Sequence, residues 1–121
     1  MKTTYETGLR GEQQAEAYLA GKGMVCLERR YRGPHGEIDL VMRDGDTLVF
    51  VEVKTRKNGT SGSALYAVSP AKQRRIAGTA MGYLLKTHQL NSAVRFDVIE
   101  ITPEAVLHIP DAFQPGGMFF R

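Results

Sequence analysis

Two segments joined by a very short connection, residues 37–43 and 48–56, place the tightest constraint on the fold of this chain. Both alternate apolar side chains with polar or charged ones, which predicts two β-strands with one buried face. The residues Asp44-Gly45-Asp46-Thr47 between them are typical of a hairpin turn. We therefore expect the two strands to pair antiparallel.

The alternation also predicts the register of this pair. A slip of one residue would bury charge, so the apolar side chains must share one side, namely Ile38, Leu40, Met42, Val49, Val51 and Val53. With a four-residue turn, Asp39 is expected directly across from Glu52, and Glu37 across from Lys54. Directly opposed Cβ atoms lie about 4.5–5.5 Å apart. The sequence therefore predicts a compact charged group on the other side.

The rest of the chain supplies helices and further strands. Apolar spacing predicts a helix over 4–21, and Ser69 followed by Pro70 predicts the start of a second helix that runs to about residue 86. Strands are expected at 24–31, 95–101 and 106–109, a breaker-rich turn at 32–36, and a loop at 57–63. The order α-β-β-β-α-β-β predicts an α/β fold, with a mixed central sheet flanked by helices, in one domain spanning 1–121.

Composition excludes several classes of protein. No uninterrupted apolar run is longer than five residues, so we expect no membrane-spanning helix and no membrane partner. The single cysteine, Cys26, excludes an internal disulfide and a cysteine-based zinc cluster, and it suits the reducing cytoplasm. The net charge of +3 is modest. Its clustering is more informative than its size.

The opposed carboxylates of Asp39 and Glu52 indicate a metal site. Two carboxylates at this separation repel each other unless a cation lies between them. Mg²⁺ and Mn²⁺ accept carboxylate oxygens and keep several waters. Glu12, in the middle of the inward face of the first helix, could supply a third oxygen, directly or through water. The alternative is that Glu12 is salt-bridged or reaches solvent.

Lys54 lies about 6.6 Å from Glu52 along the same face of its strand. A lysine in this place can orient an attacking water or stabilise charge on a phosphoryl oxygen. The alternative is a structural Glu–Lys network between strands, which contributes about 0.2–1 kcal/mol.

Basic residues form three local groups that could contact a polyanion. They follow the first strand, the third strand and the start of the second helix, and the candidates for binding nucleic acid are Arg32, Arg56, Lys57, Lys72, Gln73 and Arg75. Cations are unfavourable at a helix N-terminus unless an anion docks there. The alternative for each group is solvated surface charge.

Two motifs together resemble the core of the PD-(D/E)-x-K nuclease superfamily, which includes restriction endonucleases and archaeal Holliday-junction resolvases. They are GEIDLV at 36–41 and VFVEVKTR at 49–56. With GLRGEQQAEAYL at 8–19 and RFDV at 95–98, the whole chain resembles the YraN family of small bacterial proteins. The resemblance implies a restriction-endonuclease-like fold.

The resemblance also implies roles for individual residues. The metal-binding acid of the superfamily falls on Asp39, its second acid on Glu52, its lysine on Lys54, and the helix glutamate of the resolvase branch on Glu12. Ile38 stands where the superfamily usually has proline. The expected function is a Mg²⁺- or Mn²⁺-dependent DNA endonuclease, acting on branched or flapped DNA as a homodimer.

Two other functions stay open at this point. The first is a non-catalytic nucleic-acid-binding or scaffold protein that keeps the nuclease fold. The second is hydrolysis of RNA or a nucleotide, although the chain lacks an aromatic signature for stacking RNA bases.

Overall fold

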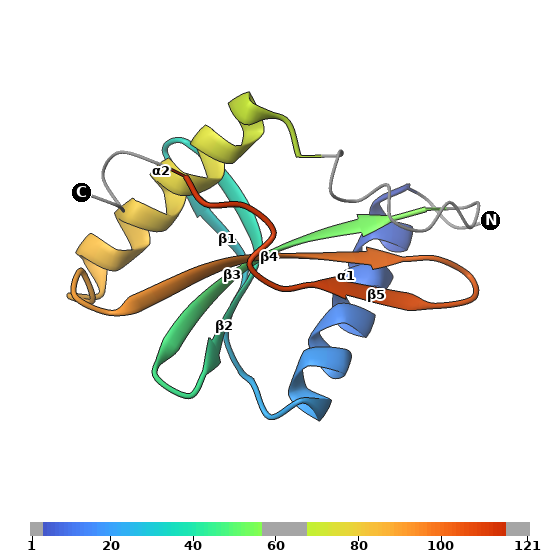
Figure 1. The fold of residues 1–121 in the computed structure, drawn as a ribbon. Helices are drawn as coiled ribbons and strands as arrows, with labels where there is room; N and C mark the ends of the chain where they lie inside the picture. The colour runs from blue at the N-terminus through green and yellow to red at the C-terminus, as the bar shows by residue number, and fades with distance from the viewer. Residues whose placement is uncertain (1–3, 57–67, 116–121) are drawn as a thin grey trace.

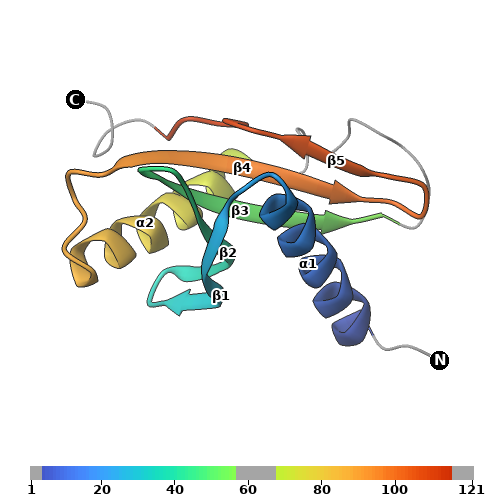
Figure 2. The same ribbon diagram turned by 90° about the horizontal axis from the view of Figure 1, so that it is seen from below.

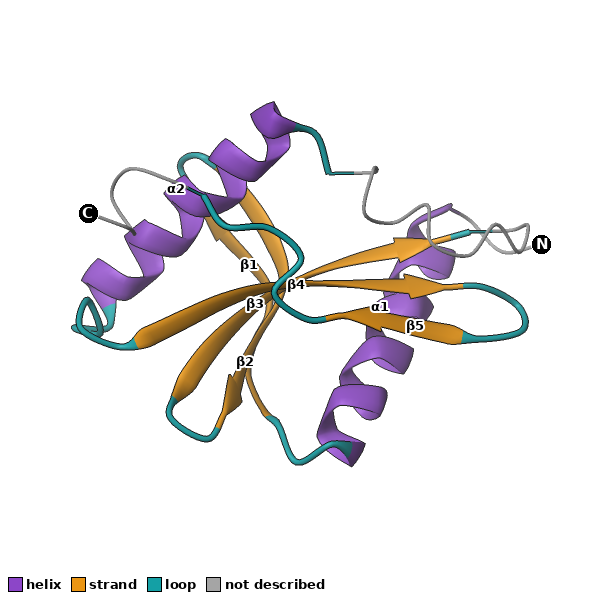
Figure 3. Cartoon of the chain, in the orientation of Figure 1, coloured by secondary structure: helices purple, strands orange, loops and turns teal. Residues whose placement is uncertain are grey.

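The structure, a computed structural model, describes residues 4–56 and 68–115. Its elements in chain order are α1 (Thr4–Gly21), β1 (Val25–Gly33), β2 (Gly36–Asp44), β3 (Thr47–Thr55), α2 (Pro70–Lys86), β4 (Ala93–Ile101) and β5 (Val106–Ile109). Figures 1 and 3 show a sheet with a helix at either side. The predicted order of elements and the predicted α/β fold with a mixed sheet are both confirmed.

The five strands form one sheet in the order β1-β2-β3-β4-β5. The β3–β4 pair is parallel and the other neighbouring pairs are antiparallel. A parallel pair needs a crossover connection, which here contains α2. Figure 1 shows the strands fanning out through a strong twist, and Figure 2 shows α1 and α2 on opposite sides of the β1–β2 hairpin.

The helix α1 covers one face of the sheet through its small and apolar side chains. Ala15 and Leu19 are fully buried against a cluster that includes Leu40, Val49 and Ile99. The helix ends at Gly21, and Gly23 follows at a φ of 95°, a conformation that glycine adopts most readily.

The helix α2 covers the other face. Ser69 caps it by accepting a hydrogen bond from the Lys72 backbone N–H at 3.2 Å, and Pro70 occupies its first turn, as predicted. Its buried side packs against a cluster that contains Phe50 and Phe96, whose rings stack with 5.6 Å between centroids. Both faces of the central strands are therefore buried.

In the β2–β3 pair, Ile38 lies on the opposite face of the sheet from the one predicted. Leu40 and Met42 pack on the α1 side, as expected, whereas Ile38 belongs to the α2-side cluster. The prediction that Ile38 shares their face is wrong. The β2–β3 ladder ends at the pair Leu40–Val51, and beyond it the Val53 backbone N–H donates to the Asp39 carboxylate at 2.7 Å. The regular alternation of β2 breaks at this point.

The strand boundaries differ slightly from the predicted ones. The turn expected at 32–36 shortens to Pro34 and His35, because Gly33 and Gly36 are already paired. β4 begins at Ala93, two residues earlier than expected. The predicted loop at 57–63, with Lys57, lies outside the described residues. No helix in the described part of the chain is long and apolar enough to cross a membrane.

Candidate functional site

Four charged side chains from three elements meet where β2, β3 and the first turn of α2 come together. Asp39 comes from β2, Glu52 and Lys54 from β3, and Lys72 from α2. They lie on the α2 side of β3, because Glu52 and Lys54 continue the alternation of the buried Leu48 and Phe50. The N-cap that starts α2 at Ser69 sets the position of Lys72 one turn later.

Asp39 is the member of this group whose pKa is strongly shifted. Burial, followed by the adjacent charge of Glu52 and a hydrogen bond with its carboxyl group, raises the pKa of Asp39 to about 8. The charge of Glu12 acts in the same direction, and the hydrogen bond from the Val53 N–H acts against it. The predicted meeting of Asp39 and Glu52 is thus present in the structure.

Glu52 is buried between two amines. Only 7% of its side chain is exposed, and its Oε2 forms an ion pair with Lys72 Nζ. Lys54 Nζ lies 3.8 Å from the same oxygen. The contact with Lys72 was not predicted, because sequence spacing does not show how far the first turn of α2 lies from β3.

The pKa values of Lys54 and Lys72 are shifted in opposite directions in these crowded surroundings. Burial, together with the neighbouring Lys72, lowers the pKa of Lys54, although Glu52 and Asp39 oppose this shift. Burial also lowers the pKa of Lys72, but its hydrogen bonds with Glu52 and Lys54 and the charges of both carboxylates outweigh this, and the net pKa is raised. The same crowded group therefore raises the pKa of Lys72 and lowers the pKa of Lys54.

Glu12 lies near this group but is held by another residue. Arg30 Nε donates to Glu12 Oε1 at 2.7 Å. Arg30 has a φ of 49°, in the left-handed region that non-glycine residues rarely adopt. Glu12 is close enough to contribute to the raised pKa of Asp39. The structure therefore agrees with the alternative in which Glu12 is salt-bridged.

Within the described residues, no group of three or more His, Cys, Asp and Glu side chains is arranged to hold a metal ion. The acids that the geometry offers to a cation are therefore the pair Asp39 and Glu52. Glu12 is held through its Oε1 in the ion pair with Arg30.

Glu37 is not opposite Lys54, and that prediction is wrong. Its Cα partner is Arg32 of β1, and the two side chains form an ion pair at 3.1 Å. The β2–β3 ladder has already ended at Leu40, so Glu37 follows the β1–β2 hairpin instead.

The remaining basic and amide candidates are spread around the site. Arg75 is exposed, and the Arg32 side chain is 81% exposed. Gln73 donates its side-chain amide to the Val68 carbonyl at 3.1 Å, so it helps to hold the start of α2. Arg56 is half-buried, and its backbone N–H donates to the Ile101 carbonyl at 2.8 Å. Among the nucleic-acid-binding candidates that the structure describes, Lys72 alone contacts Glu52.

One buried acid near the site was missed. Glu100 is fully buried and is the Cα partner of Lys54 in the parallel β3–β4 pair. It alternates with Phe96 and Val98 of the α2-side cluster, so it lies on the same side of the sheet as Lys54. The sequence signal was this alternation, which places a carboxylate where an apolar residue is expected.

Comparisons with known proteins identify the family. The model of the uncharacterised protein family UPF0102 matches residues 11–101. A UPF0102 protein of Geobacter metallireducens is 47% identical over 111 residues, which cover 88% of this chain and 91% of the relative. A UPF0102 protein of Pseudoalteromonas translucida is 45% identical over 104 residues, with coverages of 86% and 85%.

A solved structure supports the fold. Hjc of Archaeoglobus fulgidus, a Holliday junction resolvase, matches with a TM-score of 0.55 and 20% sequence identity, over 85% of this chain and 76% of Hjc. At this identity the likeness concerns the fold, which is nuclease-like. The sequence matches go further, because they span most of this chain and of its relatives. The chain belongs to the uncharacterised protein family UPF0102, the YraN family predicted from its sequence.

Proposed function

We propose that this protein is a Mg²⁺- or Mn²⁺-dependent DNA endonuclease that acts on branched or flapped DNA. The observation that carries the proposal is the buried pair of Asp39 and Glu52, which raises the pKa of Asp39 to about 8 beside two lysines. A carboxylate of raised pKa next to a lysine of lowered pKa is typical of a catalytic site. The resolvase-like fold supports DNA as the substrate.

The residues present fit a hard divalent cation. Mg²⁺ is usually held by one or two carboxylates together with waters and phosphate oxygens, and Asp39 and Glu52 provide such a pair. A cation between them would also relieve the repulsion that raises the pKa of Asp39. Lys72 forms an ion pair with Glu52 Oε2, and a cation held by this pair would neutralise the same carboxylate.

The side chains then have distinct roles. A bound cation would supply positive charge to the scissile phosphate and lower the pKa of water. Lys54, whose pKa is lowered by burial and by Lys72, orients the attacking water or accepts its proton. Lys72, next to this pair, binds a phosphoryl oxygen. The exposed Arg75 and the half-buried Arg56 bind neighbouring phosphates.

A second candidate is a DNA-binding protein that does not cleave DNA. For both candidates we propose that the protein acts in the cytoplasm. The ion pairs Lys72–Glu52 and Arg30–Glu12 favour the second candidate, because they neutralise two of the proposed acids without a metal. In either case we propose that residues 1–121 act as one domain and that branched DNA is engaged by a homodimer, since a chain this small covers little duplex.

The test is cleavage of linear, flapped and four-way-junction DNA in Mg²⁺ or Mn²⁺. We expect cleavage of the branched substrates by the wild-type protein and none by Glu52→Gln or Lys54→Ala. Cleavage that persists in both variants would come from a contaminant and contradict the assigned site. Salt-sensitive binding without cleavage would establish the second candidate.

A further inference from the structure

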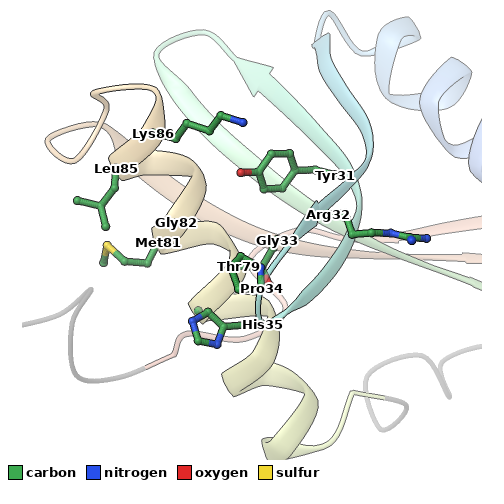
Figure 4. Close-up of a pocket in the computed structure, with 11 residues that line it drawn as sticks. Tyr31, Arg32, Gly33, Pro34, His35, Thr79, Met81, Gly82, Leu85 and Lys86 are labelled. Atoms are coloured by element: carbon green, nitrogen blue, oxygen red, sulfur yellow. The ribbon is translucent and has the colours of Figure 1, made fainter.

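Asp39, Glu52, Lys54 and Lys72 together are called the acidic site. A groove separate from it lies between the end of the β1–β2 hairpin and the second half of α2. It has a volume of about 490 Å³, which is within the range of small-molecule sites. Its walls include Tyr31 and His35 from the hairpin side and Gly78, Met81, Gly82 and Leu85 from the helix. Figure 4 shows the Tyr31 ring directed into the space between hairpin and helix, with His35 beside Thr79.

The charge of this groove favours an anionic partner. None of the described residues that line it is acidic, whereas Arg32, His35 and Lys86 are basic. Arg32 is bonded to Glu37 and points away from the groove in Figure 4, so Lys86 at the far end is the cation available to a ligand. A mostly apolar groove with a cation at its end suits an aromatic group that carries phosphate.

The groove is connected to the acidic site along one face of α2. Lys72, Arg75, Gly82 and Lys86 are spaced by 3, 7 and 4 residues and so share that face. At Arg75 this face borders the hairpin, because a Cβ on Gly36 would lie 4.0 Å from the Arg75 Cβ, and Arg75 itself stays exposed. From Lys72 to Gly82 the helix rises about 15 Å, or about four nucleotides at about 3.4 Å each.

Gly82 has no packing reason to be glycine. Glycine is unfavourable inside a helix, and a Cβ at this position would meet nothing within 4 Å. Gly78 differs, because a Cβ there would come within 3.4 Å of the His35 ring. The absence of a side chain at Gly82 keeps the groove open without serving the fold.

We propose that this groove binds an unpaired nucleobase of a DNA strand whose phosphates follow α2 from the acidic site. The inference rests on the proposed function in taking DNA as the ligand, and it specifies the substrate as DNA with an unpaired nucleotide a few positions from the cut. The base stacks in the apolar groove beside Tyr31 and His35, and Lys86 binds its phosphate.

The test measures binding without cleavage, in EDTA at low salt. The probes are a labelled five-nucleotide thymidine strand and a blunt duplex, followed by fluorescence anisotropy. Gly82→Leu is expected to weaken binding of the single strand by roughly 5- to 100-fold, the range for loss of one stacked base, and to leave duplex binding within about twofold. The matched control is Gly21→Leu, at the end of α1, where a Cβ also meets nothing within 4 Å.

A milder variant separates folding from binding. Gly82→Ala is expected to raise the melting temperature, because alanine favours the helix, while it weakens binding of the single strand. A loss of both stability and binding would instead indicate a structural role for Gly82 and overturn the inference.

The outcomes for the groove and for catalysis are independent. Failure of the wild-type protein to bind the single strand, equal weakening of both probes by Gly82→Leu, or no weakening at all would overturn the groove. A changed oligomeric state in Gly82→Leu with unchanged binding would assign the groove to contact between copies and also overturn it. Selective loss of single-strand binding in a protein that never cleaves DNA would keep the groove and refute the nuclease.

Discussion

The sheet buries two groups of charged side chains that differ in how well their carboxylates are paired. One is the acidic site, with Asp39, Glu52, Lys54 and Lys72. The other surrounds Asp97 of β4, which is fully buried. Each group contains a buried carboxylate of the sheet, Glu52 or Asp97, yet only the first combines two carboxylates in direct contact.

Asp97 is surrounded by donors. Arg95 donates to both of its oxygens at 2.9 and 3.0 Å, the Asp111 backbone N–H donates at 2.9 Å, and His108 Nε2 lies 2.7 Å away. Lys22 Nζ approaches the other nitrogen of His108 at 3.1 Å. These contacts tie β4 to β5 and to the segment after it. A buried charge paired in this way stabilises one arrangement of the chain.

Asp39 receives one backbone hydrogen bond and otherwise faces another carboxyl group. The difference lies in how each carboxylate is paired. A carboxylate with a full set of donors holds elements together, whereas a carboxylate packed against a second one has a raised pKa. The same substitution, aspartate to asparagine, should therefore have opposite effects at the two positions.

The largest effect is expected for Asp97→Asn. It removes the charge that Arg95 and His108 contact, and breaking a buried ion pair in this way costs about 3–5 kcal/mol of unfolding free energy. Urea denaturation followed by circular dichroism measures it. Glu104→Gln, at an exposed acid, is the control and should change stability by less than about 0.5 kcal/mol. A loss below 1 kcal/mol would refute the structural role of Asp97.

Asp39→Asn is expected to stabilise the metal-free protein at pH 8. The folded state raises the pKa of Asp39 from 3.8 to about 8, so it keeps a proton that the unfolded chain releases. Stability from this group is complete below about pH 4 and is lost as the pH rises to about 8, at up to about 1.4 kcal/mol per pH unit. The variant should gain at least about 1.4 kcal/mol at pH 8 and lack that slope. Denaturation curves at pH 4, 6 and 8 measure both quantities.

Addition of Mg²⁺ or Mn²⁺ should stabilise the wild-type protein more at pH 8 than at pH 5, because protons compete for Asp39 at the lower pH. At ten times the dissociation constant the gain is about 1.4 kcal/mol. Thermal melts with and without metal measure it, and chelation should reverse it. The gain should be absent in Glu52→Gln. An equal gain in that variant would place the cation elsewhere.

The smallest effect is expected for Glu37→Gln. Its ion pair with Arg32 is exposed on the Arg32 side, and such pairs contribute about 0–1 kcal/mol. Stability should change by less than about 0.5 kcal/mol, and metal-induced stabilisation should not change. Loss of the metal response in Glu37→Gln would make Glu37 part of the acidic site.

Much of the fold followed from local patterns. The hairpin signal at Gly45 and the period of two in β2 and β3 predicted the antiparallel pair, and the Ser69-Pro70 start predicted α2. The same alternation predicted that Asp39, Glu52 and Lys54 lie together. These inferences succeeded because they depend on hydrogen bonding and side-chain direction within a few residues.

Long-range packing decided what these patterns could not. Ile38 lies beyond the last β2–β3 ladder pair, Leu40–Val51, where the Val53 N–H donates to the Asp39 carboxylate instead of to a backbone carbonyl. The partner of Glu12 depends on Arg30, which takes a rare backbone conformation in β1. The residue types at Ile38 and Glu12 do not by themselves indicate these contacts.

The sequence by itself determined the order of the elements and the proximity of the three charged residues in the central hairpin. Both follow from how apolar and polar residues alternate within short segments. Only the tertiary structure brought Lys72 to Glu52, placed Glu100 beside Lys54 and surrounded Asp97 with donors. These contacts join elements far apart in the chain. Their distances are set by how the helices and strands pack and twist, which no local pattern encodes.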